Sequence, residues 1–339
     1  TNNTMMKERK LKMKKTVKTL MACMMCAGVL AGCSSNKDEK KPLVSVAQIV
    51  EHTSLNEIRD SFKAEMERLG YKEGENIAYD FKDAGNDPTT ANSIMSTFAG
   101  NKSDVIVAIA TPTATAAANY SKDIPIVFAA VSDPVGSKLM TNVEKPDKNI
   151  TGTSDEIQID QIIALAQKID PKMKKLGFLY NPGEPNSVTN LEKAKAYCKE
   201  NNIELVEGSG TNISELQSAI SVLTDSVDAI LAPNDNTVAS SMAPLVEAAN
   251  KKKVPVYTGA DSMVKDGGFA TVGINYTELG QETAKMVDQI LKGTKVEDIP
   301  VKVFNTNLNI YVNKKTMDTL GITLPDEVKN DKNLVMIEE

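Results

Sequence analysis

Two segments of the chain share one pattern, and this pattern restricts the fold more than any other feature of the sequence. Residues 104–134 and 228–262 each contain an apolar run, a polar turn, a helical stretch, a proline and a second apolar run. Apolar runs of this length, bounded by turns and separated by a helical spacing, are typical of buried parallel strands joined by crossover helices. Strands and helices are expected to alternate along most of the chain, so the sequence predicts an α/β fold.

The two segments lie in different halves of the chain, which predicts two similar lobes that face one cleft. In sheets of this kind, ligands bind outside the carboxyl ends of the strands. Polar turns follow the apolar runs of both segments, and we expect them to lie at the cleft: residues 111–113, 132–133, 234–237 and 259–262.

The remaining elements are expected from periodicity and from turn residues. Strands are predicted at 43–50, 77–81, 105–110, 126–131, 175–180, 203–207 and 270–274, with an extended run at 301–312. Helices are predicted at 55–69, from 89 or 90 to about 99, and at 157–169, 188–201, 213–223, 277–291 and 312–320. Ser54 is the expected N-cap of the first of these helices, because its hydroxyl can accept a hydrogen bond from a free backbone N–H.

The amino terminus predicts secretion. Seven basic residues among the first 18 precede an apolar stretch at 19–31, which is too short to span a bilayer. It ends in Leu-Ala-Gly-Cys, and this sequence resembles the lipobox of bacterial lipoproteins. The resemblance implies a signal peptide at 1–32, a lipid on the thiol of Cys33, a lipidated linker at 33–42, and an extracytoplasmic protein anchored to the bacterial cell membrane. An uncleaved anchor and an ordinary secretory signal are the alternatives.

Charge and cysteine content exclude several classes of protein. Residues 1–32 carry seven of the 39 basic and one of the 45 acidic residues, so the remainder has a net charge of −12. Such an acidic surface repels nucleic acid. With the signal removed and Cys33 acylated, Cys198 is the remaining thiol, which excludes an internal disulfide and a cysteine zinc site. A multi-histidine metal site is also excluded, because His52 is the only histidine.

Motifs between about residues 44 and 324 resemble, in order, those of the substrate-binding lipoproteins of ABC transporters. The group concerned includes tryptophan- and phenylalanine-binding proteins. The motifs are SLNEIRDSF, ATPTA, IPIVFAAVSDPVGSKL, NITGTSD, YNPGEPNS, NDNTV, ATVGINYTELGQETA and NIYVN. The resemblance implies a type I periplasmic-binding fold, in which two Rossmann-like lobes with parallel sheets hold a ligand in the cleft between them. The expected lobes are residues 43–153 with about 276–304, and residues 154–275 with about 305–339.

The polar turns supply the candidate ligand-binding residues. Hydroxyls and backbone amides at helix N-termini favour a carboxylate, for which Thr111, Ser132 and Ser187 are the main candidates. Asp235, Asp261 or both could hold an ammonium group. Capping and turn formation are the alternative roles for all of these residues. The full predicted set is His52, Thr111, Thr113, Ser132, Asp133, Glu184, Asn186, Ser187, Asn234, Asp235, Asn236, Thr237, Asp261 and Tyr276.

The family resemblance implies a binding protein without a cofactor or catalytic activity. The expected ligand is an amino acid, with tryptophan or phenylalanine first, and the expected partners are an ABC permease and its ATPase. A nucleoside, a sugar or another small metabolite is the alternative ligand. A cofactor-free racemase would need two cysteines as acid and base, and here only Cys198 is available. A transcription regulator of this fold would need a basic DNA-binding head, where this chain has the predicted signal peptide.

Overall fold

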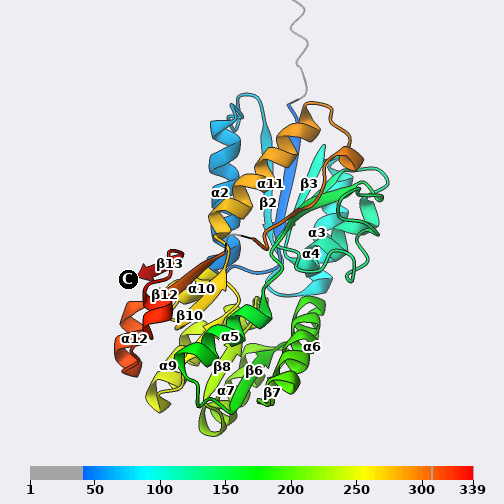
Figure 1. The fold of residues 1–339 in the computed structure, drawn as a ribbon. Helices are drawn as coiled ribbons and strands as arrows, with labels where there is room; N and C mark the ends of the chain where they lie inside the picture. Colours follow the sequence, from blue (N-terminus) through cyan, green and yellow to red (C-terminus); the bar gives the residue numbers. More distant parts are fainter. Residues whose placement is uncertain (1–40, 307, 339) are drawn as a thin grey trace, which may run out of the picture. The chain divides into compact units, whose positions relative to one another are not determined.

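The computed structural model describes residues 41–306 and 308–338 of the 339-residue chain (Figure 1). The predicted signal peptide, Cys33 and nearly all of the predicted linker lie outside the described residues. Within the described residues, the strands form two sheets, one of six strands and one of seven. We call the six-stranded sheet and the helices packed on it the first lobe. The seven-stranded sheet and its helices form the second lobe.

The first sheet has the strand order β11-β5-β4-β3-β1-β2, and all of its described neighbours pair in parallel. Its central strands β3 and β4 consist entirely of buried residues, as expected for a sheet that is covered on both faces. The strands are β1 (Leu43–Gln48), β2 (Ala78–Asp83), β3 (Val105–Ile109), β4 (Ile126–Ala129), β5 (Ile150–Ser154) and β11 (Lys302–Val303).

The second sheet has the order β13-β12-β10-β9-β8-β6-β7. Its described pairs are parallel except for β10 with β12, which is antiparallel. Two parallel-dominated sheets confirm the predicted α/β class. The strands are β6 (Lys175–Tyr180), β7 (Glu204–Ser209), β8 (Ala229–Ala232), β9 (Val256–Thr258), β10 (Ala270–Gly273), β12 (Asn309–Asn313) and β13 (Leu334–Ile337).

Helices cover both sheets. The first lobe carries α2 (Thr53–Arg68), α3 (Pro88–Gly100), α4 (Thr111–Ala117) and α11 (Tyr276–Leu291). The second lobe carries α5 (Ile159–Ile169), α6 (Pro185–Glu200), α7 (Ile213–Ser226), α9 (Met242–Lys252), α10 (Asp261–Lys265) and α12 (Lys314–Leu320), with the short helices α8 (Asn236–Ala239) and α13 (Asp326–Lys329). Although α11 follows a strand of the second sheet, it packs along α2 and against β3, β4 and β5 of the first (Figure 1).

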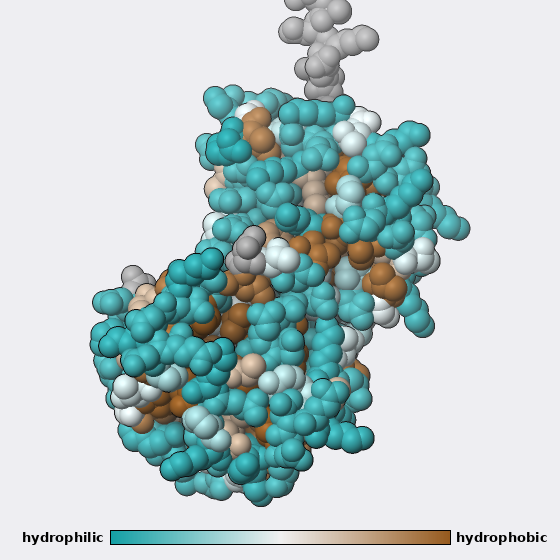
Figure 2. All heavy atoms as spheres, viewed as in Figure 1, coloured by the Kyte–Doolittle hydropathy of each residue, from teal (hydrophilic) through white to brown (hydrophobic). Residues whose placement is uncertain are grey.

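Figure 2 shows a surface that is mostly hydrophilic, with several hydrophobic patches near the junction of the two lobes. Within residues 41–306 and 308–338, no helix combines the length and the hydropathy that a membrane span requires.

Several predicted element boundaries are wrong for identifiable reasons. Ser54 is not the N-cap of the first helix, because that position belongs to His52 and Ser54 lies buried in the first turn. Helix α6 begins at Pro185 rather than at residue 188, since proline fits the first helical turn, where no backbone N–H is needed. Strand β5 is missing from the prediction because its sequence, ITGTS, contains only one large apolar residue although every position is buried.

Candidate functional site

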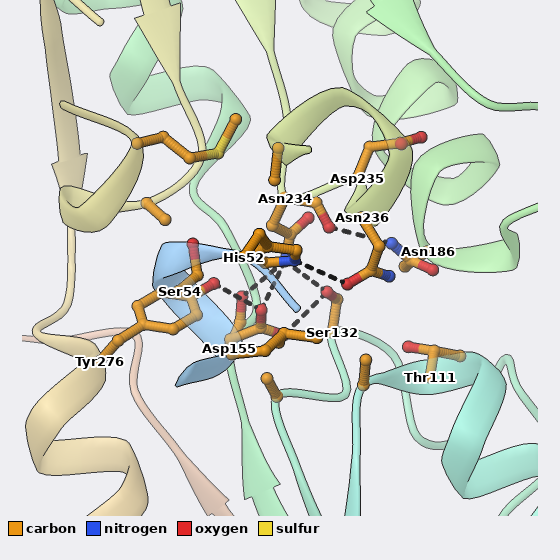
Figure 3. A pocket seen from close by; sticks show the side chains of 16 residues that line it. His52, Ser54, Thr111, Ser132, Asp155, Asn186, Asn234, Asp235, Asn236 and Tyr276 are labelled. Carbon is orange, nitrogen blue, oxygen red and sulfur yellow. Dashed lines mark hydrogen bonds between the residues drawn. The ribbon is translucent and has the colours of Figure 1, made fainter. Parts of the chain in front are cut away.

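A cavity lies where the carboxyl ends of the strands of both sheets face each other (Figure 3). Its volume is about 20 Å³ when only the space open to the centre of a water molecule is counted, and about 340 Å³ when all atom-free space is included, some of which is open solvent. Its position agrees with the rule that open parallel sheets bind ligands at the carboxyl ends of their strands. The lining residues are His52, Ser54, Leu55, Ala110, Thr111, Ala130, Ser132, Asp155, Asn186, Asn234, Asp235, Asn236, Ala239, Ala260, Met263 and Tyr276.

The turns after β3 and β4 place backbone directly against the cavity. Ala110 and Ala130 both have positive φ angles, 80° and 56°, which non-glycine residues rarely adopt. The turn at Ala110 leads at once into α4, so that Thr111 reaches the cavity at the start of this helix. The Thr111 hydroxyl makes no hydrogen bond with any described residue, and it is therefore available to a ligand.

Asp155 forms the charged centre of the cavity. Its carboxylate accepts hydrogen bonds from Ser132 Oγ at 2.9 Å, Asn234 Nδ2 at 2.7 Å and the Tyr276 hydroxyl at 2.7 Å (Figure 3). Burial raises the pKa of Asp155, and these three donors lower it in part. Ser132 and Asn234 come from different lobes, so the carboxylate is held from both sides. A partly saturated carboxylate of this kind can accept further hydrogen bonds from a cation.

Two further carboxylates, Glu184 and Asp235, join the starts of α6 and α8, and Asp235 also lines the cavity. Glu184 accepts hydrogen bonds from the backbone N–H groups of Asn236 and Thr237 and from both of their side chains, at 2.6–3.2 Å. Asp235 accepts from Asn181 N and Ser187 Oγ at 2.6 Å and from Val238 N at 2.9 Å. Burial and the nearby Glu184 carboxylate raise the pKa of Asp235. These carboxylates therefore support the turn that carries the Asn234 and Asn236 side chains.

Six of the sixteen lining residues are apolar. Tyr276 is the one aromatic side chain among the described residues that line the cavity. Apolar walls of this kind are found in small-molecule binding sites, although this cavity has more polar than apolar lining residues. The apolar lining residues are Leu55, Ala110, Ala130, Ala239, Ala260 and Met263.

The structure brings together eight of the fourteen predicted ligand-binding residues and leaves six outside the lining. Those that line the cavity are His52, Thr111, Ser132, Asn186, Asn234, Asp235, Asn236 and Tyr276. Those that do not are Thr113, Asp133, Glu184, Ser187, Thr237 and Asp261.

The six residues outside the lining have other contacts or are buried. Ser187 donates a hydrogen bond to Asp235, and Thr237 donates one to Glu184. Thr113 is completely buried in the first lobe. Asp133 accepts a hydrogen bond from Gly136 N within its own turn, and the buried Asp261 faces Lys265 Nζ at 3.1 Å.

Sequence reasoning missed Asp155, Ser54 and the apolar lining residues. Asp155 directly follows β5, and that strand was not recognised, so nothing placed this carboxylate at a strand end. The only available signal was the motif NITGTSD, which ends on this residue. Ser54 was read as a cap, whereas its Oγ accepts a hydrogen bond from Ser262 Oγ of the second lobe at 2.6 Å.

Comparisons with known proteins agree with this architecture. A family model described as "ABC transporter substrate binding protein" matches residues 43–335. The tyrosine-binding protein of Clostridioides difficile (strain R20291) is 37% identical over 324 residues, which cover 92% of this chain and 94% of that protein.

Two solved structures extend the comparison. An ABC domain from Streptococcus pneumonia in complex with L-Trp is 35% identical, with a TM-score of 0.82 over 87% of this chain and 100% of that one. A ligand-free, open substrate-binding protein with adhesive properties from Clostridium difficile is 39% identical, with a TM-score of 0.66 over 88% and 99% of the chains. The fold is thus the expected type I periplasmic-binding fold, and the chain belongs to the family of ABC transporter substrate-binding proteins.

Proposed function

We propose that this protein captures an aromatic L-amino acid between its two lobes and delivers it to an ABC permease, while a lipid on Cys33 anchors it outside the membrane. In this proposal, one lobe consists of residues 43–153 with about 276–304, and the other consists of residues 154–275 with about 305–339. The observation that carries the proposal is a buried carboxylate, Asp155, in a cavity at the strand ends of both lobes that combines polar groups with six apolar lining residues. The relatives that bind L-Trp or are named for tyrosine support the same class of ligand.

Asp155 is the best partner for the ligand's ammonium group. Of the two aspartates predicted for this role, Asp235 already accepts three hydrogen bonds and Asp261 does not line the cavity. Asp155 also accepts three, but Figure 3 shows its carboxylate among the side chains that converge on the cavity, whereas the carboxylate of Asp235 is directed away from them. An ammonium would offset the burial of this carboxylate, since opposite charges stabilise each other in a poorly solvated site.

The ligand's carboxylate is best held by Thr111. Of the hydroxyls predicted for this group, Ser187 donates to Asp235 and Ser132 donates to Asp155, so neither has a hydrogen left for a ligand. The Thr111 hydroxyl lines the cavity without a partner among the described residues. The aromatic ring then lies along the apolar side chains of the lining.

The substitution Asp155→Asn tests this proposal. A hydrogen bond to a charged group contributes about 1.5–3 kcal/mol, so we expect L-Trp and L-Tyr to bind roughly ten- to a hundred-fold more weakly by calorimetry. The corresponding des-amino acids should lose much less affinity, because they lack the ammonium. Asp261→Asn is the matched control and should bind normally, since its carboxylate lies outside the cavity. Native affinity of Asp155→Asn for both amino acids would contradict the proposal.

A further inference from the structure

Two side chains that line the cavity carry buried acceptor atoms without a partner. Nδ1 of His52 and Oδ1 of Asn186 make no hydrogen bond with any described residue. Buried polar atoms are almost always paired, so a lone acceptor in a binding cavity indicates that a ligand or a water molecule supplies the donor. The neighbouring groups fix the orientation of each side chain, and this orientation decides which of its atoms is an acceptor that needs a donor from the ligand.

The orientation of the Asn236 amide is fixed by Glu184. Oε2 of Glu184 lies 2.6 Å from Asn236 Nδ2 and also accepts the Asn236 backbone N–H at 3.1 Å. A carboxylate oxygen already facing an N–H donor acts as an acceptor, so the amide nitrogen must point toward it. The amide oxygen of Asn236 therefore points the other way, toward His52.

This amide oxygen determines the tautomer of His52. Nε2 of His52 lies 3.3 Å from Asn236 Oδ1, which can only accept, so Nε2 must carry the hydrogen (Figure 3). Burial lowers the pKa of His52 to about 4, so the ring is neutral at neutral pH and has a single N–H group. Nδ1 is consequently a lone-pair acceptor. The chain of contacts from Glu184 through Asn236 thus leaves one atom at the cavity that requires a hydrogen-bond donor.

We propose that His52 determines ligand specificity, because its Nδ1 accepts a hydrogen bond from an O–H or N–H group on the ligand's side chain. The cavity would then favour a phenol or an indole over a plain phenyl ring. This inference rests on the proposed function, in which the ammonium pairs with Asp155 and the side chain of the amino acid is left to meet the other acceptors. According to this inference, phenylalanine binds more weakly than tyrosine and tryptophan, whereas the sequence predicts tryptophan and phenylalanine alike as ligands.

Asn186 is the competing acceptor. Its Nδ2 lies 3.1 Å from the carbonyl oxygen of Asn234 and 3.4 Å from Glu184 Oε2, which leaves its Oδ1 free. A charged ammonium has three N–H groups and can use this oxygen in addition to Asp155. Asn186 is therefore expected to affect all amino acids alike, while His52 should separate ligands that have a side-chain donor from those that lack one.

Calorimetry with two matched ligand pairs tests the inference. The pairs are L-Tyr with L-Phe, and L-Trp with its isostere in which a benzothiophene sulfur replaces the indole N–H. The wild-type protein should bind the member with the donor at least about ten-fold more tightly in at least one pair, as expected when a buried acceptor loses its partner. Equal affinities within both pairs would overturn the inference and leave the proposed function intact. Failure of all four to bind would instead contradict the proposed function, and the inference with it.

Three variants complete the test. His52→Phe keeps a ring but lacks both the acceptor and the Nε2–H that bonds Asn236. The ratio of affinities within the selective pair should therefore fall to nearly one, whatever affinity both members lose together. His52→Gln offers an amide oxygen and should restore part of the ratio. Asn186→Ala is the control, in which the ratio should stay unchanged even if both members bind more weakly. A wild-type ratio in His52→Phe, or its loss in Asn186→Ala alone, would overturn the inference.

Discussion

At the scale of single residues, the charge on Asp155 couples ligand binding to pH. Burial raises the pKa of the Asp155 carboxyl in the free protein, whereas a bound ammonium would stabilise the charged form and lower it. Binding should therefore be strongest above the raised pKa of Asp155, and it should weaken as the pH falls through that value. At a pH between the pKa of Asp155 in the ligand-bound protein and its higher pKa in the free protein, binding of the amino acid should release a proton.

Calorimetry in two buffers with different ionisation enthalpies measures this proton release directly. Asp155→Asn is the control, and it should bind its residual ligand without the proton release that belongs to this carboxyl. If the variant retains the wild-type proton release, another group is responsible, and the buried Asp235 would be the first to consider.

The sequence predicts the residues that line the cavity only where they directly follow a recognisable strand. Thr111, Ser132 and Asn234 follow recognisable apolar runs, and all three line the cavity. A position after a strand end does not by itself place a side chain in the cavity. Thr113 and Thr237 occupy matching positions in the two repeated segments, and both are fully buried behind the lining. The direction in which a turn side chain points depends on backbone geometry and on packing against the other lobe, which a single sequence does not display.

At the scale of elements, the contact between α2 and α11 depends on a glycine. A Cβ atom at Gly280 would clash with the Ser61 hydroxyl and with the carbonyl oxygen of Ile58, both on α2. Gly280→Ala should therefore force the helices apart and destabilise the protein by about 1–3 kcal/mol, partly offset by the higher helix propensity of alanine. Urea denaturation should show a lower midpoint with an unchanged slope.

Gly100→Ala provides the matched control, since Gly100 ends α3 and no neighbouring atom lies within 4 Å of the added Cβ. This variant should be neutral or slightly more stable than the wild type. Equal midpoints for both variants would mean that α2 and α11 are not as closely packed as the structure has them.

The sequence predicts a helix or strand correctly where an apolar run or a helical periodicity marks it. Strand β6 is an example, because its predicted bounds agree with the structure. Strand β5 shows why other elements were not predicted. Gly152, at a φ of 157°, lies against Phe128 of β4, and a Cβ at this position would overlap with Phe128. This close contact depends on the absence of a side chain, and a search for apolar residues passes over it.

At the scale of the whole molecule, residues 42–306 and 308–338 have their lobes arranged more like those of the ligand-bound relative than like those of the open one. The TM-score is 0.82 to the L-Trp complex and 0.66 to the ligand-free structure, although the sequence identity favours the latter, 39% against 35%. Direct hydrogen bonds also join the two lobes, between Ser262 and Ser54 at 2.6 Å and between Thr53 and Asp266 at 2.8 Å. These bonds stabilise the closed arrangement and would break if the lobes separated.

Because the ligand binds between the lobes, a bond that exists only when they are closed should contribute to affinity without touching the ligand. Thr53→Val removes the hydroxyl that donates to Asp266. This hydrogen bond is exposed to solvent, which weakens its electrostatic part, so we expect the typical net contribution of about 0.5–1.5 kcal/mol. Affinity for every ligand should then fall by the same factor, roughly two- to twelve-fold. This uniform loss differs from the selective loss expected for His52 variants.

Thr90→Val is the matched control, because Thr90 Oγ1 also donates to an aspartate, Asp87 at 2.6 Å, but within the first lobe. It should lower stability slightly and leave affinity unchanged. Small-angle scattering of the ligand-free proteins gives an independent measurement, in which Thr53→Val should have a larger radius of gyration than Thr90→Val if closure is reversible. Equal affinity losses in the two variants would contradict the idea that bonds between the lobes set the closed population, since only one of these hydrogen bonds spans the cleft.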